Sequence, residues 1–223
     1  MKLWAVIPVK PFQQGKSRLT AVLREEQRSQ LNQILLENTL TIVGQAAHIN
    51  NIVVISRDSK VLDTARAYTQ WTIYEQTSQG LNAALSTAAQ FVVKQGGDQI
   101  CVLPTDLPLL TSGDVDAFVS LANEEPEIVI APDRKRDGTN ALLMNPVGVI
   151  PFSFGRKSFT RHLEHARLQH ARSAVYEKPS MGFDLDLPED LEWLKLNNPE
   201  DRLSERSHCA EISNLLKEFL EEL

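Results

Sequence analysis

The sequence predicts an α/β fold built on a doubly wound, mainly parallel mixed sheet. Short runs of apolar and β-branched residues recur along the chain, and stretches with the apolar spacing of helices separate them. These runs show little alternation between apolar and polar residues, which is typical of strands covered on both faces. Because strands and helices alternate, each helix is expected to connect two parallel strands by a right-handed crossover, so most of the sheet should be parallel.

The expected strands share a high content of Val, Ile and Leu. In chain order they are Leu3–Val9, Ile52–Ser56, Trp71–Tyr74, Ile100–Leu103 and Ile128–Ala131. After Asp133 the rhythm changes, and two further strands are expected at Ala141–Met144 and Ala174–Tyr176.

The expected helices share an apolar face at helical spacing or a recognisable start signal. They are Glu25–Ala46, Ser59–Tyr68 after an Asp58 cap, Ala83–Gln95, a helix opened by Thr111 or Ser112, Arg156–Gln169 and Leu187–Leu196. In the last of these, Pro188 suits the first helical turn, where its missing N–H costs nothing.

The chain is expected to divide at residue 197. Residues 1–197 form the α/β domain, and residues 198–223 form a C-terminal helical extension with a polar start. Four apolar residues give this extension one apolar face: Ile212, Leu215, Leu216 and Phe219. That face is expected to dock on the domain or on a second subunit, as in a homodimer.

Composition excludes several classes of protein. With 223 residues, 42% of them hydrophobic, and a net charge of -6, the chain suits a globular protein without general affinity for nucleic acid or anionic membranes. No apolar run approaches the length of a membrane span, and the start is too short for a signal peptide. Cys101 and Cys209 show no metal spacing and indicate reduced thiols in a cytoplasmic protein, with Cys101 in the core.

The loop after the first expected strand carries a basic cluster. Its sequence, IPVKPFQQGKSRL, contains the Gly-Lys-Ser of a phosphate-binding loop, but Lys10 stands where such a loop needs another glycine. Two prolines also remove backbone N–H groups that would wrap a phosphate. Lys10, Lys16 and Arg18 are instead placed to surround a triphosphate with their side chains. An ordinary solvated basic loop is the alternative.

Acidic residues follow two of the expected strands. In LPTDLPLL, Asp106 stands just past an apolar strand between two stiffening prolines, which suits a carboxylate aimed at Mg²⁺. A turn or capping aspartate is the alternative, although Thr111 and Ser112 are better placed to cap. In FDLDLP, Asp184 and Asp186 share one side of an extended segment, so one is a candidate second ligand and the other a candidate helix cap.

Two segments near the middle of the chain suit an anionic substrate. The loop Asp133–Asn140 combines charges with glycine, hydroxyl and amide groups that suit a mobile substrate loop, although on its own composition a solvated turn is the better explanation. The segment Phe154–Ser158 opens a helix with basic residues, where free N–H groups attract anions. The histidines that follow do not converge on one metal and are expected on the helix surface: His162, His165 and His170.

Taken together, these segments resemble a known family. Over about residues 1–197 the chain is similar to the 2-phospho-L-lactate / phosphoenolpyruvate guanylyltransferases of coenzyme F-420 biosynthesis, which have a Rossmann-like, glycosyltransferase-A-type nucleotide-diphospho-sugar transferase fold. The motifs that carry the resemblance are IPVKPFQQGKSRL, QGLNAAL, LPTDLPLL, APDRKRDGTNALL, FGRKSFTRHLEHA and FDLDLPEDL. Each is weak alone, and their order and spacing together are specific.

The resemblance implies a reaction and a set of roles. A phosphate oxygen of a small phosphorylated carboxylic acid attacks the α-phosphorus of GTP, and pyrophosphate leaves. The implied catalytic residues are Lys16, Arg18 and Asp106; those for the nucleotide are Lys10, Lys16, Arg18, Asn82 and Ala83; those for the acceptor are Thr139, Gly155 and Ser158; and those for Mg²⁺ are Asp106, Asp186 and Asp184.

Two other functions stay open at this point. The first is a cytidylyl- or uridylyltransferase that acts on a cofactor or sugar phosphate, although the glycine-rich first loop of those families is absent. The second is a non-catalytic nucleotide-binding module, which has no need for the three aspartates. Which phosphorylated acid is the acceptor is not decided by the sequence.

Overall fold

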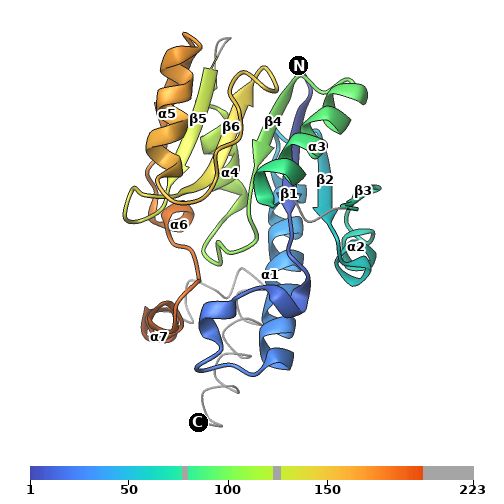
Figure 1. Ribbon diagram of the computed structural model, residues 1–223, viewed down its shortest axis with the longest axis vertical. Helices are drawn as coiled ribbons and strands as arrows, with labels where there is room; N and C mark the ends of the chain where they lie inside the picture. The colour runs from blue at the N-terminus through green and yellow to red at the C-terminus, as the bar shows by residue number, and fades with distance from the viewer. Residues whose placement is uncertain (77–79, 123–126, 198–223) are drawn as a thin grey trace.

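The computed structural model describes residues 1–76, 80–122 and 127–197, and in these the expected α/β fold is present (Figure 1). Seven strands form one sheet in the order β3-β2-β1-β4-β6-β5-β7. Their bounds are β1 Leu3–Pro8, β2 Asn51–Ser56, β3 Trp71–Tyr74, β4 Gln99–Val102, β5 Glu127–Pro132, β6 Thr139–Asn145 and β7 Arg172–Val175. Every strand expected from the sequence is confirmed, with ends shifted by a few residues at most.

The sheet is parallel except at β6. Strand β1 pairs in parallel with both β2 and β4, whereas β6 runs antiparallel between β4 and β5. The first residue of β6, Thr139, lies at the sheet edge where β4 and β5 end, and ligands of open α/β sheets bind at that edge.

The six expected helices are confirmed in order, and the short helix α6 was not expected from the sequence. Their bounds are α1 Glu25–Gln45, α2 Ser59–Ala65, α3 Leu81–Lys94, α4 Ser112–Val119, α5 Ser158–Leu168, α6 Pro179–Gly182 and α7 Pro188–Asn197. Asp58 caps α2 and Thr111 caps α4, as expected. Helix α5 starts at Ser158 rather than Arg156, because Gly155 and Lys157 have positive φ angles that a helix does not accept.

Apolar residues on both faces of the sheet hold the helices in place. Along β1, Ala5 and Ile7 join a cluster with α1, α2 and α4, while Trp4 and Val6 join a cluster with α3 and α5. The side chains of a strand alternate between faces, so both sets are buried because both faces are covered. This double cover explains why the strands read as continuous apolar runs.

A third apolar cluster lies beyond the carboxyl ends of the strands. It joins Leu19, from the loop after β1, with Leu31 and Leu35 of α1 and with Leu185 and Leu191 near α7. Figure 1 shows the loop after β1 and α7 below the sheet, on the side where the strands end. Segments about 170 residues apart in sequence are thus brought together under the sheet edge.

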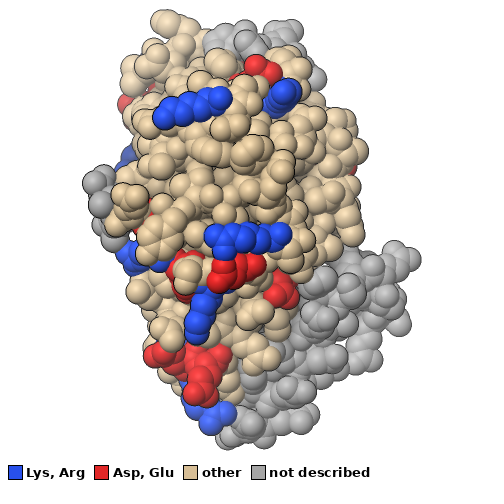
Figure 2. Space-filling view, turned by 90° about the vertical axis from the view of Figure 1, so that its right-hand side faces the viewer, with Lys and Arg blue, Asp and Glu red and all other residues tan. Residues whose placement is uncertain are grey.

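Several further expectations concern the surface and the chain end. Cys101 is buried and unpaired, as expected, and burial raises the pKa of its thiol. No helix of the described residues is long and apolar enough to cross a membrane. Figure 2 shows one face on which basic and acidic side chains lie next to one another rather than in a continuous basic patch. The expected extension at 198–223, Cys209 included, lies outside the described residues.

The start of α4 supplies a prediction about stability. The buried Asp114 carboxylate caps the helix through the backbone N–H of Thr111 and pairs with Lys178. Burial alone raises the pKa of Asp114, but hydrogen bonds, first of all from Lys178, outweigh burial and lower it. We expect Asp114→Asn to lower the free energy of unfolding at neutral pH by about 2 kcal/mol, because it removes a charged hydrogen bond.

The pH dependence of that difference has a definite sign. A carboxyl whose pKa is lowered by folding stabilises the protein above its unfolded pKa and loses this effect as the pH falls through its folded pKa. Urea unfolding of wild type and Asp114→Asn from pH 7 down to pH 3 should therefore show a gap that narrows with acidification. A gap that stays constant or widens would contradict the assignment.

Candidate active site

The loop after β1 presents a lysine and does not wrap a phosphate. The N–H groups of Gln14 and Gly15 both donate to the carbonyl of Pro11, so they are used within the loop. Gly15 lies so close to α1 that a Cβ there would stand 2.4 Å from the Asn32 side-chain nitrogen. Lys16 follows with φ 52° and ψ 38°, a left-handed conformation that is uncommon for a residue with a side chain. Such strain tends to gather at functional sites.

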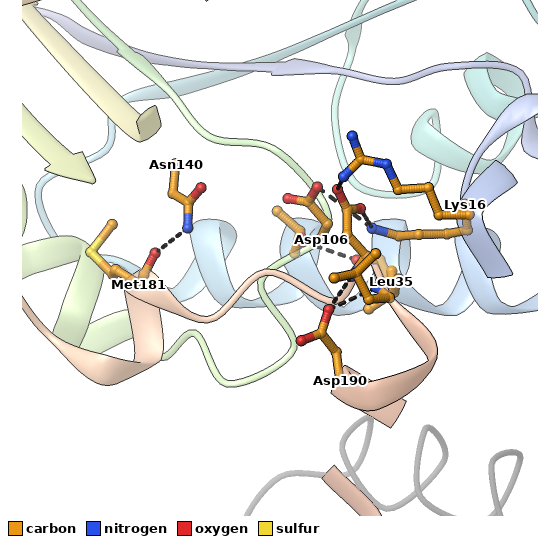
Figure 3. A network of polar contacts seen from close by, with 10 residues as sticks. Lys16, Leu35, Asp106, Asn140, Met181 and Asp190 are labelled. Atoms are coloured by element: carbon orange, nitrogen blue, oxygen red, sulfur yellow. Dashed lines mark hydrogen bonds and ion pairs between the residues drawn. The ribbon is translucent and has the colours of Figure 1, made fainter. Parts of the chain in front are cut away.

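Lys16 joins two aspartates that are far apart in sequence (Figure 3). Its ammonium nitrogen lies 3.1 Å from Asp186 Oδ1 and 3.5 Å from Asp106 Oδ2, and its side chain is 7% exposed. Arg18 lies 3.7 Å from the other oxygen of Asp186. The backbone N–H of Leu185 also donates to the Asp106 carbonyl at 2.9 Å, which fixes the two acidic segments against each other. The structure therefore brings Lys16, Arg18, Asp106 and Asp186 together, and their roles toward nucleotide and metal stay predictions.

The third aspartate completes a patch of negative charge. Burial raises the pKa of the Asp184 carboxyl above its ordinary value, and the nearby carboxylates of Asp106 and Asp186 raise it further. Three carboxylates that repel one another, with Lys16 and Arg18 beside them, are a favourable setting for a hard cation. Within the described ranges, however, no three acidic, histidine or cysteine side chains have the spacing of a preformed metal site. The Mg²⁺ assignment of Asp106, Asp184 and Asp186 stays a prediction.

Asp190 fixes the position of Asp186, and sequence reasoning missed it. Its Oδ2 accepts hydrogen bonds from the backbone N–H groups of Asp186 and Leu187 at 2.9 and 2.7 Å, and its Oδ1 pairs with Arg134 at 2.5 Å. Burial raises the pKa of Asp190, but Arg134 and the two N–H groups outweigh burial and lower it. An acid at the third residue of a helix opened by Pro188 was the available signal.

The loop between β5 and β6 is linked to the same network. Asn140 donates from its side-chain amide to the Met181 carbonyl at 2.9 Å (Figure 3). The backbone N–H of Arg134 donates to the Gly182 carbonyl at 3.2 Å. Arg134 also stacks over the Phe183 ring at 4.5 Å. These contacts place the start of β6 beside the segment that carries Asp184 and Asp186.

The expected acceptor residues lie around the start of α5. Gly155 has φ +115°, which favours glycine, and Ser158 is buried with a hydroxyl that has no hydrogen-bond partner in the described structure. Asp137 ties the β5–β6 loop to this helix, since it accepts from the Lys157 N–H through Oδ2 and from the Phe159 N–H through its carbonyl. Asp137 was not identified from the sequence.

The nucleotide residues expected at α3 are placed less simply. The N–H of Phe154 donates to Asn82 Oδ1 at 2.8 Å, and Asn82 Nδ2 donates to the Phe154 carbonyl at 3.2 Å. The Asn82 amide therefore holds the loop that precedes Gly155. Ala83 is half-buried in the first turn of α3, and Lys10 is exposed. Their contact with a nucleotide stays a prediction, and Gln79 of the QGLNAAL motif lies outside the described residues.

One expectation about the histidines was wrong. His162 is fully buried rather than on the helix surface, and its ring bonds Thr139 and the backbone of Ser153. Burial lowers its pKa to about 4, and the positive charges of His165 and Arg161 contribute to the lowering. The inward face of α5 consists of Ser158, Phe159, His162 and Ala166. Two of these four residues are polar, so the apolar spacing of the helix did not identify His162 as buried.

The fold and the family of the chain together define a nucleotidyltransferase. A Desulfovibrio desulfuricans protein assigned as a nucleotide-diphospho-sugar transferase superimposes with a TM-score of 0.73, covering 98% of this chain and 99% of that one at 16% identity, which supports the fold. A family model described as "Guanylyl transferase CofC like" matches residues 3–205. The chain belongs to this family of guanylyltransferases.

Curated relatives agree with the family. A phosphoenolpyruvate guanylyltransferase from Rubrobacter xylanophilus is 41% identical over 191 residues, which are 86% of this chain and 92% of that one. A 2-phospho-L-lactate guanylyltransferase from a Methanocaldococcus species is 29% identical over 186 residues, 83% of this chain and 78% of that one. The relatives thus share the activity and differ in the acceptor for which they are named.

Proposed function

We propose that this enzyme transfers the guanylyl group of GTP to the phosphate of a small phosphorylated carboxylic acid, with phosphoenolpyruvate as the first candidate. The single observation that carries the proposal is the meeting of Lys16 with Asp106 and Asp186 at the sheet edge where ligands bind. In the reaction, an oxygen of the acceptor phosphate bonds to the α-phosphorus, and the bond from that phosphorus to the pyrophosphate leaving group breaks.

The basic loop is assigned to the triphosphate. Lys16 and Arg18 lie beside the acidic patch, where they can offset the charge that grows on the departing pyrophosphate. Lys10 belongs to the same loop and is free to reach the nucleotide from solvent. Group transfer between phosphates asks the protein mainly for positioning and charge neutralisation. We assign Asn82 and Ala83 at the start of α3 to the nucleoside.

The aspartates are assigned to Mg²⁺ on the chemistry of their side chains. Asp106, Asp184 and Asp186 supply the hard oxygen ligands that Mg²⁺ prefers, and phosphates of the substrate commonly complete its coordination. When bound, the ion would polarise the phosphate under attack and help to align the reactants. Asp190 and Leu185 serve this assignment by holding Asp186 and Asp106 in register.

The acceptor is assigned to the segment around α5. Thr139, Gly155 and Ser158 would hold its carboxylate or phosphate, and the unpartnered, buried Ser158 hydroxyl supports this assignment. Arg156, Lys157 and Arg161 are exposed beside it and add positive charge. The acceptor phosphate is already anionic at neutral pH, so attack on the α-phosphorus needs no dedicated general base.

The names of the relatives guide the choice of acceptor. Phosphoenolpyruvate and 2-phospho-L-lactate share a phosphate and a carboxylate on neighbouring atoms, and both occur in the names of the relatives. We favour phosphoenolpyruvate because the relative with 41% identity carries that name. The product would then enter coenzyme F-420 biosynthesis in the cytoplasm.

A single assay tests the proposal. We expect purified enzyme with Mg²⁺, GTP and phosphoenolpyruvate to release pyrophosphate and to form a diphosphate-linked guanosine adduct. The mass of this adduct should equal the masses of GTP and phosphoenolpyruvate together minus the mass of pyrophosphate. Parallel reactions with CTP, UTP and ATP, and with 2-phospholactate or 3-phosphoglycerate, test each substrate separately. Release with CTP or UTP but not GTP would favour the cytidylyl or uridylyl alternative, and no release with any pair would refute the proposal.

A further inference from the structure

A buried histidine links two segments of the proposed acceptor site. His162 lies in the second turn of α5 and is fully buried. Its Nδ1 lies 3.0 Å from the Thr139 hydroxyl at the start of β6, and its Nε2 lies 3.0 Å from the backbone nitrogen of Ser153. Both ring nitrogens are therefore engaged, one with a strand and the other with the loop that leads to Gly155.

The contact with Ser153 determines which nitrogen carries the proton. A backbone N–H can only donate, so Nε2 must accept with its lone pair and cannot itself be protonated. The remaining proton of the neutral ring is then on Nδ1. It points to the Thr139 oxygen, which accepts it. Burial also keeps the ring neutral, and the pKa of about 4 agrees with this state.

This arrangement fixes the donor and acceptor roles of the Thr139 hydroxyl. A threonine hydroxyl has one proton to donate, and its oxygen accepts from other donors. Because His162 donates to that oxygen, the proton of Thr139 is left for another group. Within the described part of the chain, the Thr139 hydroxyl makes no hydrogen bond other than the one with His162. Its proton is thus available to an oxygen that comes from outside the chain.

A second hydroxyl, that of Ser158, lies on the same face of α5 as His162. Ser158 precedes His162 by four residues, which is one helical turn, and its buried hydroxyl lacks a partner. Two hydroxyl groups without an acceptor in the protein suit a ligand with several anionic oxygens. The loop in front of α5 is held by histidines as well, since His165 Nε2 lies 3.0 Å from the Ser153 hydroxyl.

We propose that His162 is a positioning residue that turns the Thr139 hydroxyl into an obligatory hydrogen-bond donor for the carboxylate or phosphate of the acceptor. The inference rests on the proposed function, in which Thr139 contacts the acceptor. A histidine in this role accepts from the Gly155 loop and donates to β6, so it also couples the two segments that the acceptor must bridge. No proton moves to or from His162 during the reaction.

Two substitutions separate the functions of the two ring nitrogens. Asparagine can place its amide N–H near the position of Nδ1 and keep the donor to Thr139, whereas glutamine reaches the position of Nε2 and loses that donor. We expect His162→Gln to raise the KM for phosphoenolpyruvate by about 10-fold or more and His162→Asn to raise it much less, with the KM for GTP within about 2-fold in both. His170→Gln, just past the end of α5, is the matched control, because His170 is exposed and its loss should leave both KM values within about 2-fold.

The outcomes distinguish this inference from the function on which it rests. An active wild type whose His162→Gln variant keeps its KM for phosphoenolpyruvate would overturn the inference alone, and an inactive wild type would instead refute the proposed function. If the variants fail to fold, long-range nitrogen–proton NMR of the wild type still decides. Protonation of His162 at Nδ1 near pH 7 supports the inference, and protonation at Nε2, or at both nitrogens, overturns it.

Discussion

Asp106→Asn is expected to reduce the rate of pyrophosphate release by at least about 100-fold, while the folded structure is retained. The change removes one negative charge from the acidic patch without changing the shape of the side chain. Asp106 is about 29% exposed, and its contact with Lys16 at 3.5 Å is a partly solvated ion pair. Its loss should therefore change the free energy of unfolding by no more than about 1 kcal/mol.

The same strand supplies a matched control. Asp98 precedes β4 at the opposite edge of the sheet, where its carboxylate accepts from the Lys2 N–H at 2.7 Å. Asp98→Asn should leave the rate of pyrophosphate release unchanged. The thermal shift produced by Mg²⁺ with GTP should also shrink in Asp106→Asn and persist in Asp98→Asn. If Asp106→Asn kept full activity, the role given to this carboxylate would have to be abandoned.

The strands were predictable because double burial leaves a plain signal. In β5 every residue is buried, and the unbroken apolar run from Ile128 to Pro132 excludes a surface strand. Helix starts were predictable where a cap follows a simple rule, as at Asp58 and Thr111. The start of α5 was predicted two residues too early because Lys157 has a left-handed backbone conformation. Lysine has no intrinsic preference for that conformation, so the sequence does not indicate it.

The candidate site was predictable as far as the sheet-edge rule reaches. That rule selects Asp106 after β4, and the structure brings Lys16 and Asp186 to it. Asp190, which holds Asp186 from four residues away, was missed although its place in the first turn of α7 was a local signal. Asp137 and His162 were missed because they act through contacts with segments 20 and 23 residues away. No local pattern encodes such pairings. A buried polar residue on a helix looks like a surface residue until the neighbouring strand is placed.

Asn82 is a residue whose position was predicted but whose hydrogen-bond partner was not. The family resemblance implies that Asn82 lies near the nucleotide. In the structure, both polar atoms of its side-chain amide bond the backbone of Phe154. A residue in a motif can thus serve a site by shaping a loop, and only the partner 72 residues away in the sequence reveals this role.

The second large effect is expected at Lys16. Lys16→Met should weaken GTP binding roughly 10- to 100-fold, because a lysine in contact with phosphate contributes a charged hydrogen bond. Methionine has a similar length and meets the same backbone cost at φ 52°, so the substitution isolates the ammonium. Isothermal titration with GTP measures the affinity directly.

Folding should respond much less than binding. The carboxylates that face Lys16 are 29% and 36% exposed, so solvent screens the ion pairs, and we expect the free energy of unfolding to change by less than about 2 kcal/mol. Loss of the ammonium also leaves the acidic patch with less compensating positive charge, since Arg18 remains 3.7 Å from Asp186. The thermal shift caused by Mg²⁺ alone should therefore be larger in Lys16→Met than in the wild type, the opposite of the change in GTP affinity.

These opposite signs make the prediction demanding. A variant with a disrupted fold would lose both its GTP affinity and its thermal shift with Mg²⁺. Removal of an ammonium that competes with Mg²⁺ for the carboxylates instead increases the thermal shift with Mg²⁺ while the GTP affinity decreases. Lys94→Met, at the end of α3, is the control for loss of a lysine elsewhere and should change neither quantity. Unchanged GTP affinity in Lys16→Met would mean that the lysine serves only to neutralise the aspartates, and the nucleotide would then have to be bound by other groups.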